Sequence, residues 1–315
     1  MIDVIIAVII DWIMGDPYWF PHPVIYIGKL IGFLEKRGRC FIKQDKYLKL
    51  WGGLIVLLVS FICYFVPFII LKLLRDTFWV KHIVNILFLW TTLAARCLHK
   101  EGIKVCYSLE RNDIRDARVK LSYIVGRETS QLSEEEIIRA DVETISENTS
   151  DGIIAPLIFG LIGGAPLAML YKGINTMDSM LGYITPKYKY IGFFPAKVDD
   201  IFNFVPARIS GMLICLSAPI VIGSIPKSIK IMLRDRKNHK SPNCAYPEAA
   251  TAGALQVQLG GTNTYFGEKM YKPTIGDKIN HLNEKHIKDT IRLMYTAEIL
   301  CLIFSVILYS AIRLL

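Results

Sequence analysis

The sequence predicts an all-α fold, a polytopic helical membrane protein whose polar loops form amphipathic helices. The 315-residue chain is 52% hydrophobic and 21% charged, with a mean hydropathy of +0.37, which is more apolar than a typical soluble domain. Its apolar residues also gather in long runs, and about 20 such residues are needed to cross a bilayer. The runs lie at residues 1–14, 51–74, 79–98, 152–171, 201–225 and 294–315.

The first run, residues 1–14, is short and contains Asp11. A signal peptide would carry a basic amino-terminal region and a small-residue cleavage site, and this run has neither. We therefore expect a retained first membrane helix. The runs 51–74, 79–98 and 294–315 are continuous and read as full crossings.

The runs 152–171 and 201–225 are interrupted by glycine and proline, at Gly163-Gly164-Ala165-Pro166, Pro206 and Pro219. Broken helices occur at membrane depth where they line a cavity or are buried in protein. These two runs are therefore predicted to be broken spans or re-entrant segments.

Lysine and arginine are concentrated in the loops 15–50, 99–151 and 226–293. If every run is a full crossing, these three loops fall on one side, as the positive-inside rule expects. The placement of all three basic loops on one side predicts about six crossings with both termini outside. The 172–200 loop then lies on the other side although it carries site-like residues, so either its flanking runs re-enter and return, or the site sits at membrane depth.

The polar loops 99–151 and 226–293 are predicted to be helical. Ser133 followed by Glu136 is a capping box, and apolar residues follow it at helical spacing. Residues 113–124 show the same spacing. The sequence has no internal repeat, low-complexity tract or linker, so we expect one membrane-embedded domain over residues 1–315.

Other classes of protein and site are disfavoured by the charge and cysteine patterns. The net charge is +9, but the basic residues lie between apolar runs, as in loops facing anionic lipid, and no nucleic-acid-binding pattern appears. The seven cysteines are scattered without a C-x-x-C pair, which argues against a disulfide framework or zinc site. His281 and His286 are expected at the surface.

Five polar clusters adjoin the apolar runs, and the first contains Asp16 and His22. Prolines on both sides of His22 fix the direction of its imidazole, which titrates near neutral pH. The alternative is a rigid turn that leaves the membrane with a solvated histidine.

The second cluster, Glu147, Asn148 and Asp151, precedes the run 152–171. Its side chains would suit Mg²⁺, or they would simply cap a helix. The third cluster, Asn175 and Asp178, would share one face of a helix, or act as a helix cap.

The fourth cluster joins Asp200 to Arg208, an arginine in an apolar stretch. Such an arginine grips a phosphate or carboxylate, or snorkels to lipid headgroups. The fifth cluster is the densest, and its small residues and glycine pair would let backbones approach closely. It contains no P-loop or dinucleotide-binding fingerprint. Its candidate residues are Arg234, Arg236, His239, Asn243, Glu248, Gly260 and Gly261.

These motifs, in this order, resemble the CobD/CbiB family of cobalamin biosynthesis proteins. The resemblance runs from Gly15 to about Gly267 and rests on GDPYWFPHPVIYIG, SENTSDGIIAPL, NTMDSMLGY, the DD…PAR segment and RD…H…SPN…EAATAGAL…LGG. It implies an adenosylcobinamide-phosphate synthase, an amide-forming ligase that joins aminopropanol or its O-phosphate to a propionate of adenosylcobyric acid. It also implies ATP and Mg²⁺, a multi-pass location in the cell membrane, and other membrane enzymes of late cobalamin assembly as partners.

Residue types assign the roles within the expected site. The catalytic candidates are His22, Glu147, Asp151, Asp178 and His239, and the metal candidates are Glu147, Asp151, Asp178 and Asp200. The histidines would accept the proton of the attacking amine. The substrate-binding candidates are Asp16, Asn148, Asn175, Arg208, Arg234, Arg236, Asn243, Glu248, Gly260 and Gly261.

Two rival functions fit the same pattern. A transporter of corrinoids or other small molecules would also place polar residues beside broken membrane helices. A noncatalytic membrane scaffold or sensor would tolerate alanine in all five clusters. Amide formation from cobyric acid distinguishes the synthase from both.

Overall fold

The structure, a computed structural model, describes residues 1–17, 19–183, 185–265 and 268–314. Contacts between residues divide the chain into two compact units. Unit 1 comprises Met1–Ala94 and Ala155–Asn203, and unit 2 comprises Ala95–Ile154 and Phe204–Leu315. The single domain expected from the sequence stays a prediction.

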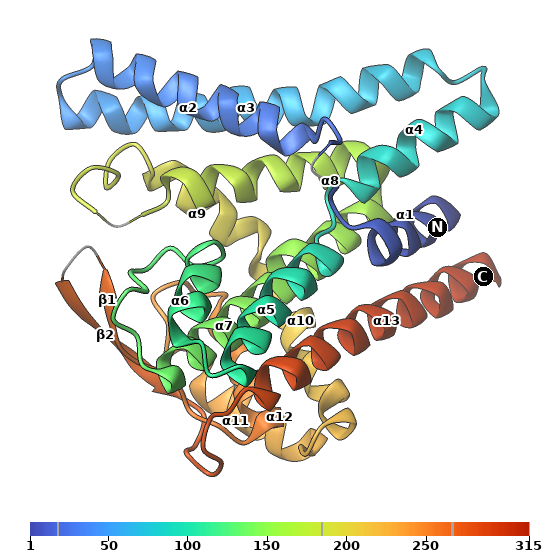
Figure 1. Ribbon diagram of the computed structural model, residues 1–315. Coiled ribbons are helices and arrows are strands. Elements are labelled where there is room, and N and C mark those ends of the chain that lie inside the picture. The colour runs from blue at the N-terminus through green and yellow to red at the C-terminus, as the bar shows by residue number, and fades with distance from the viewer. Residues whose placement is uncertain (18, 184, 266–267, 315) are drawn as a thin grey trace. The chain divides into compact units, whose positions relative to one another are not determined.

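The helices of unit 1 are joined by turns and loops, and its described residues contain no strand (Figure 1). Its core joins α2, α3 and α8 through buried apolar side chains that include Ile31, Val59 and Met177. A Cβ atom on Gly173 would lie 2.5 Å from Cys63 Sγ, so the glycine lets α3 and α8 pack closely. The helices are α1 (Ile2–Met14), α2 (Pro23–Phe41), α3 (Asp45–Leu73), α4 (Phe78–Trp90), α8 (Ala155–Leu181) and α9 (Phe193–Phe202).

Helix α8 is kinked where the sequence predicts a break. Gly163 and Gly164 leave helical geometry, and Gly164 has φ 64°, a conformation that glycine adopts without strain. The kink exposes backbone donors, and Asn85 Oδ1 of α4 accepts the Ala165 N–H at 3.2 Å. Asn85 also donates to Asp3 of α1 at 2.6 Å, so its side chain links α1, α4 and α8 by hydrogen bonds.

In its described residues, unit 2 contains seven α-helices, two short helical turns and one β-hairpin (Figure 1). The capping box of α7 is confirmed, since Ser133 and Glu136 bond each other's backbone N–H. Ile137 and Ile138 behind it are buried, as predicted. The segments are α5 (Ala95–Glu110), α6 (Ile114–Ser122), α7 (Glu134–Thr149), the π-helical turn η1 (Ser150–Ile154), α10 (Phe204–Ser217), the 3₁₀ turn η2 (Ala218–Ile220), α11 (Ile225–Asp235), α12 (Ala245–Leu255), β1 (Leu259–Tyr265), β2 (Glu268–Ile275) and α13 (Lys285–Leu314).

Helix α12 lies at the centre of unit 2, and all eleven of its residues except Tyr246 are buried. Its small side chains let α11 approach closely. A Cβ atom on Gly253 would lie 2.8 Å from Ser228 Cα of α11. The close backbone approach expected from this alanine-rich segment is confirmed.

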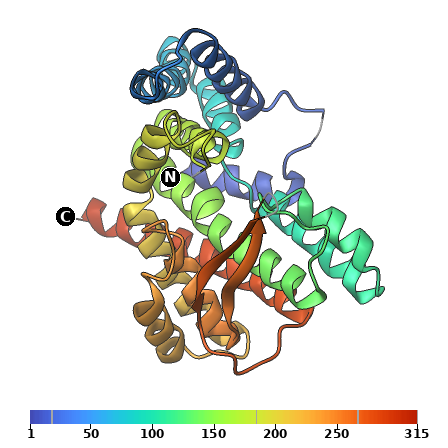
Figure 2. The same cartoon turned by 90° about the vertical axis from the view of Figure 1, so that its left-hand side faces the viewer.

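The antiparallel hairpin of β1 and β2 was not predicted (Figure 2). Gly260 and Gly261, expected to let backbones approach closely, begin β1 with φ 79° and 90°, and the register shifts between Leu259 and Gly261. The glycines therefore form an irregular start of the strand. Threonines and tyrosines in both strands favour extended structure.

Four helical stretches of the described residues are long and apolar enough to cross a membrane: Asp45–Leu73, Phe78–Glu110, Glu134–Leu181 and Lys285–Arg313. Phe193–Phe202 and Phe204–Ile220 together make a fifth if they count as one span. The expectation of about six crossings is therefore too high. Helix α1 has 13 residues and measures about 20 Å at 1.5 Å per residue, less than a bilayer core.

Three further expectations need correction. Most of the predicted 15–50 loop is helical, because α2 fills Pro23–Phe41. Helix α8 continues into the predicted 172–200 loop and ends at Leu181, so Asn175 and Asp178 lie near its end rather than at a helix start. His286 is buried instead of exposed, and its Nδ1 accepts the Asn283 N–H at 3.1 Å. All seven cysteines are free, as predicted.

Candidate active site

Three carboxylates follow one another at four-residue spacing along the end of α7 and into η1. Glu143 and Glu147 lie on α7 and Asp151 in the π-helical turn, and residues four apart share a helix face. Single π-helical turns inside α-helices often occur at functional sites. This acidic face is the base of the candidate site in unit 2.

Glu143 is fixed by a complete set of partners. Its Oε2 pairs with Arg127 Nη2 at 2.5 Å, and its Oε1 accepts the Gly260 N–H at 2.8 Å. Both side chains are almost fully buried: that of Arg127 is 8% exposed and that of Glu143 is 3% exposed. A buried ion pair is stable only when its remaining hydrogen-bonding groups are satisfied, so Glu143 positions β1 and is a structural carboxylate.

Cys244 and Glu248, one helical turn apart at the start of α12, face the acidic residues. The Cys244 thiol donates to Glu147 Oε1 at 3.0 Å. Burial, followed by the charges of Glu147, Asp151 and Glu248, raises the pKa of the Cys244 thiol well above its usual value. Cys244 therefore stays a thiol and orients Glu147.

Glu248 is a buried carboxyl whose pKa is raised. Its residue is 1% exposed, and Oε1 has no hydrogen-bond partner among the residues that the structure describes. Burial raises its pKa to about 8; the Lys272 ammonium opposes the shift, and Glu143 and Glu147 add to it. At neutral pH Glu248 is mainly a protonated acid, which is a frequent property of acid–base groups in enzymes.

His239 lies in the loop between α11 and α12. Its Nδ1 accepts the Ser241 N–H at 3.0 Å, so the neutral ring carries its proton on Nε2. Burial, and then Lys272, lowers the pKa of His239, while Glu147 and Glu143 act in the opposite direction. In this arrangement His239 is a hydrogen-bond donor through Nε2 rather than a proton acceptor.

Arg208 of α10 is held beside the same loop. Its Nη1 donates to Asn243 Oδ1 at 3.1 Å, and its guanidinium lies over the Tyr246 ring at 4.5 Å. Ser210 Oγ, on the same helix, lies within hydrogen-bonding distance of Ser150 Oγ of η1, at 3.1 Å. Arg208 is therefore anchored within unit 2, next to α12.

The other unit 2 candidates have structural partners. Arg234 makes a bidentate pair with Asp235 at 2.8 Å and a second pair with Asp277 at 2.8 Å. Arg236 donates to the Leu233 carbonyl at the end of α11. Gly260, besides its bond to Glu143, accepts from Arg139 Nη1 at 3.2 Å, and Asn148 donates to the Thr144 carbonyl at 2.9 Å.

The remaining candidates belong to unit 1. His22 caps α2, accepting the Val24 N–H at 3.3 Å through Nδ1, and its Nε2 lies 3.6 Å from Asp16 Oδ1. Its neutral ring therefore also carries the proton on Nε2. Asp200 pairs with Lys197 at 3.0 Å.

Asn175 and Asp178 lie near the end of α8. Gly182 makes room for the Asp178 carboxylate, since a Cβ atom there would lie 1.9 Å from Asp178 Oδ1. The structure thus groups Glu147, Asp151, His239, Asn243 and Glu248 in unit 2, while Asp16, His22, Asn175, Asp178 and Asp200 belong to unit 1.

Several polar residues of these sites were not singled out from the sequence. Cys244 and Lys272 act on residues far along the chain, and Arg127 pairs with Glu143, 16 residues further on. No local pattern reveals these partners. In unit 1, Tyr171 donates to Asn203 at 2.8 Å and Asn203 to the buried Asp199 at 2.9 Å. The four-residue spacing of Glu143, Glu147 and Asp151 is the one signal that the sequence offered.

Within the described residues, no group of three or more histidine, cysteine, aspartate or glutamate side chains is placed to hold a metal ion alone. Mg²⁺ in phosphate chemistry usually takes one or two carboxylates and completes its shell with phosphate oxygens and water. Glu147 and Asp151, on successive turns, are a donor set of that kind. The two carboxylates therefore have the chemistry to hold Mg²⁺ together with phosphate oxygens.

The fold and the cluster define a helical membrane protein with a buried, ionisable polar site. Residues 4–294 match the CobD/Cbib protein family, and the chain belongs to this family. It is 67% identical over 308 residues to the cobalamin biosynthesis protein CobD of Clostridium acetobutylicum, covering 98% of both chains. It is 46% identical over 298 residues to the cobalamin biosynthesis protein CbiB of Salmonella typhimurium, covering 94% of this chain and 93% of that one. No solved structure matches.

Proposed function

We propose that this protein is an enzyme of cobalamin biosynthesis that converts adenosylcobyric acid to adenosylcobinamide or its phosphate. The bond formed is an amide between a corrin propionate and the amine of aminopropanol or its O-phosphate. Membership of the family and the printed names of the relatives support the pathway. The observation that carries the catalytic assignment is the buried Glu248 carboxyl, with a pKa of about 8, close to Glu147, whose charge also acts on His239.

The reaction requires activation of a carboxylate, because a carboxylate is a poor acyl donor. Phosphorylation by ATP would make the propionate an acyl phosphate, and the amine would then displace phosphate. Mg²⁺, held by Glu147 and Asp151, would neutralise charge on the phosphate groups. The guanidinium of Arg208 would contact a phosphate or the propionate, since planar guanidinium groups bind both in bidentate fashion.

The attacking amine must lose a proton, and we assign Glu248 as the acceptor. A base works best when its pKa lies near the working pH, and the pKa of Glu248 is about 8. His239 would contribute its Nε2–H as a donor to developing negative charge, because its Nδ1 already accepts a backbone N–H. This division replaces the sequence-based idea that a histidine accepts the proton.

The test is amide formation by the purified full chain in detergent. Cobyric acid, ATP and Mg²⁺ are supplied with either aminopropanol or its O-phosphate, and products are measured by mass spectrometry. We expect Asp151→Asn and Arg208→Ala to abolish product, while Glu134→Gln, an exposed carboxylate at the start of α7, keeps wild-type turnover. Normal turnover in both site variants would refute the site, and absence of product from the wild-type chain would refute the reaction.

A corrinoid or small-molecule transporter is the second candidate, favoured by the kink of α8 at Gly164. A transporter would take up cobyric acid into proteoliposomes in the absence of aminopropanol, and it would form no amide product when ATP is added.

We further propose a multi-pass location in the cytoplasmic membrane, where the bilayer, the small-molecule substrates and other membrane enzymes of late cobalamin assembly would be the partners.

A further inference from the structure

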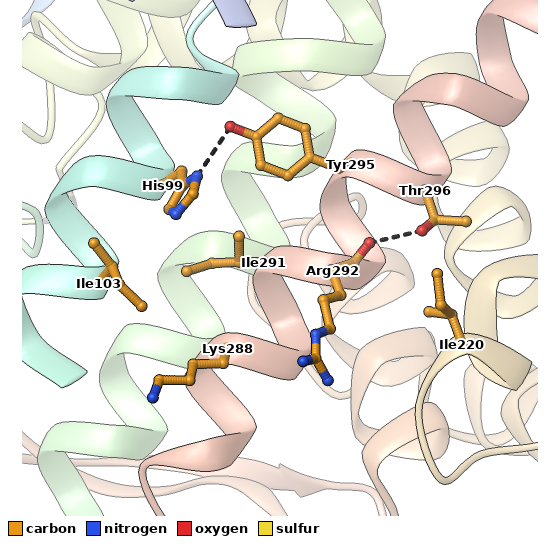
Figure 3. A pocket seen from close by; sticks show the side chains of 8 residues that line it. All are labelled: His99, Ile103, Ile220, Lys288, Ile291, Arg292, Tyr295 and Thr296. Atoms are coloured by element: carbon orange, nitrogen blue, oxygen red, sulfur yellow. Dashed lines mark hydrogen bonds between the residues drawn. The ribbon is translucent and has the colours of Figure 1, made fainter. Parts of the chain in front are cut away.

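A second site of unit 2, between α5 and α13, shares no lining residue with the acidic cluster. It is an open cleft of about 410 Å³ (Figure 3), within the range of sites that hold small organic ligands. Isoleucines line its middle, contributed by α5 (Ile103), α13 (Ile291) and η2 (Ile220). Neither the proposed reaction nor its candidate residues use this cleft.

The two ends of the cleft differ in charge. Lys288 and Arg292, one turn apart on α13, lie together at one end, and the His99–Tyr295 pair lies at the other (Figure 3). Arg292 Nη1 donates to Asp289 at 2.9 Å, and its side chain is 60% exposed. One such bond uses a single donor of the five that a guanidinium has. Lys288 pairs with Glu110 and is 37% exposed.

The cleft lies where α13 changes from charged to apolar. The stretch Lys285–Arg313 is a candidate membrane span. Its first eight residues contain three basic side chains and Asp289, whereas an apolar sequence begins at Leu293. Tyr295, whose hydroxyl lies 3.1 Å from His99 Nδ1, occupies the transition, and tyrosine is enriched at membrane–water interfaces.

We propose that this cleft binds an anionic phospholipid of the surrounding bilayer. The phosphate lies against Arg292 and Lys288, and one acyl chain follows the isoleucines toward His99 and Tyr295. The basic end complements a phosphodiester, and basic pockets between membrane helices bind such headgroups. The apolar middle has no use for a free phosphate ion, which would gain nothing from the isoleucines.

The test measures binding of fluorescent phosphatidylglycerol and phosphatidylcholine with identical acyl chains to the full-length protein in detergent micelles. The variants are the double substitution Arg292→Gln and Lys288→Gln, and Ile103→Trp, which fills the cleft. Lys227→Gln, an exposed lysine on α11, is the matched charge control. Glycerol 3-phosphate is the competitor that carries the headgroup phosphate without a chain.

Each basic residue near an anionic lipid contributes about fivefold in affinity. We expect the double variant to bind phosphatidylglycerol about twenty-five-fold more weakly and phosphatidylcholine with almost unchanged affinity. Ile103→Trp should weaken both lipids, while Lys227→Gln and glycerol 3-phosphate should change neither. Equal affinity of the wild-type chain for the two lipids, an unchanged double variant, or full competition by glycerol 3-phosphate would each overturn the proposal.

Discussion

Replacing Glu248 with glutamine should make the protein more stable, and by an amount that depends on pH. The glutamine side chain has nearly the same volume as glutamic acid but cannot ionise. Glu248 is buried, and its pKa in the folded protein is about 8, against an ordinary value of 4.5. The unfolded chain therefore releases this proton at a lower pH than the folded chain does.

The sign follows from which state binds the proton more tightly. The folded pKa is the higher one, so the stability that the protonated carboxyl contributes is complete below pH 4.5 and is lost as pH rises through 8. Each pH unit between these values costs about 1.4 kcal/mol. At pH 7 the wild-type chain has lost roughly 3 kcal/mol relative to Glu248→Gln, and above pH 8 the difference stays near roughly 5 kcal/mol.

The assay is the thermal unfolding midpoint of both chains in the same detergent at pH 5, 7 and 9. We expect the midpoint of Glu248→Gln to exceed the wild-type midpoint by an amount that grows from pH 5 to 8 and is then constant. Glu134→Gln, at an exposed carboxylate, should show no such growth. A difference between Glu248→Gln and the wild-type chain that does not vary with pH would refute the assignment of a raised pKa.

Three other substitutions test the packing and the ion pair. Gly173→Ala should destabilise unit 1 by about 1–3 kcal/mol in chemical unfolding, because the added Cβ would lie 2.5 Å from Cys63 Sγ. The control Gly32→Ala, with no atom within 4 Å of its Cβ, should instead stabilise the protein by up to about 1 kcal/mol. Equal effects of the two substitutions would count against the close packing of α3 and α8. Ser133→Ala should lower stability by about 1 kcal/mol through loss of the α7 cap, with Ser122→Ala, exposed at the end of α6, as the control that should lose less. Arg127→Met should lower the free energy of unfolding by about 3–5 kcal/mol, because it leaves Glu143 buried without its cation. Adding Glu143→Gln should recover much of this stability. A double variant no more stable than Arg127→Met would contradict this account of the pair.

The sequence predicted the features that depend on neighbouring residues. The capping box needs only Ser133 and Glu136, and the break of α8 needs only Gly163 and Gly164, so both were readable and both are confirmed. Apolar runs likewise identified the long spans. The count of crossings was too high because the first run is apolar but forms a helix of only 13 residues.

The site was harder to predict from the sequence, because its geometry depends on partners elsewhere in the chain. Glu143 owes its fixed position to Arg127 and to the Gly260 N–H, and Gly260 lies more than one hundred residues further on. The hairpin that carries Gly260 has no strong local signal beside so many helices. Glu248 is buried because α12 packs at the centre of unit 2. A single glutamate in an alanine-rich segment does not by itself predict this burial.

The pH dependence of amide formation tests the catalytic proposal most directly. Product from cobyric acid and the amine would be timed for the wild-type chain and Glu248→Gln between pH 6 and 9. With Glu248 as the proton acceptor, the wild-type rate rises about tenfold per pH unit at low pH and levels off near pH 8, while Glu248→Gln forms little product at any pH. A Glu248→Gln enzyme with the wild-type rate and the wild-type profile would contradict the proposal.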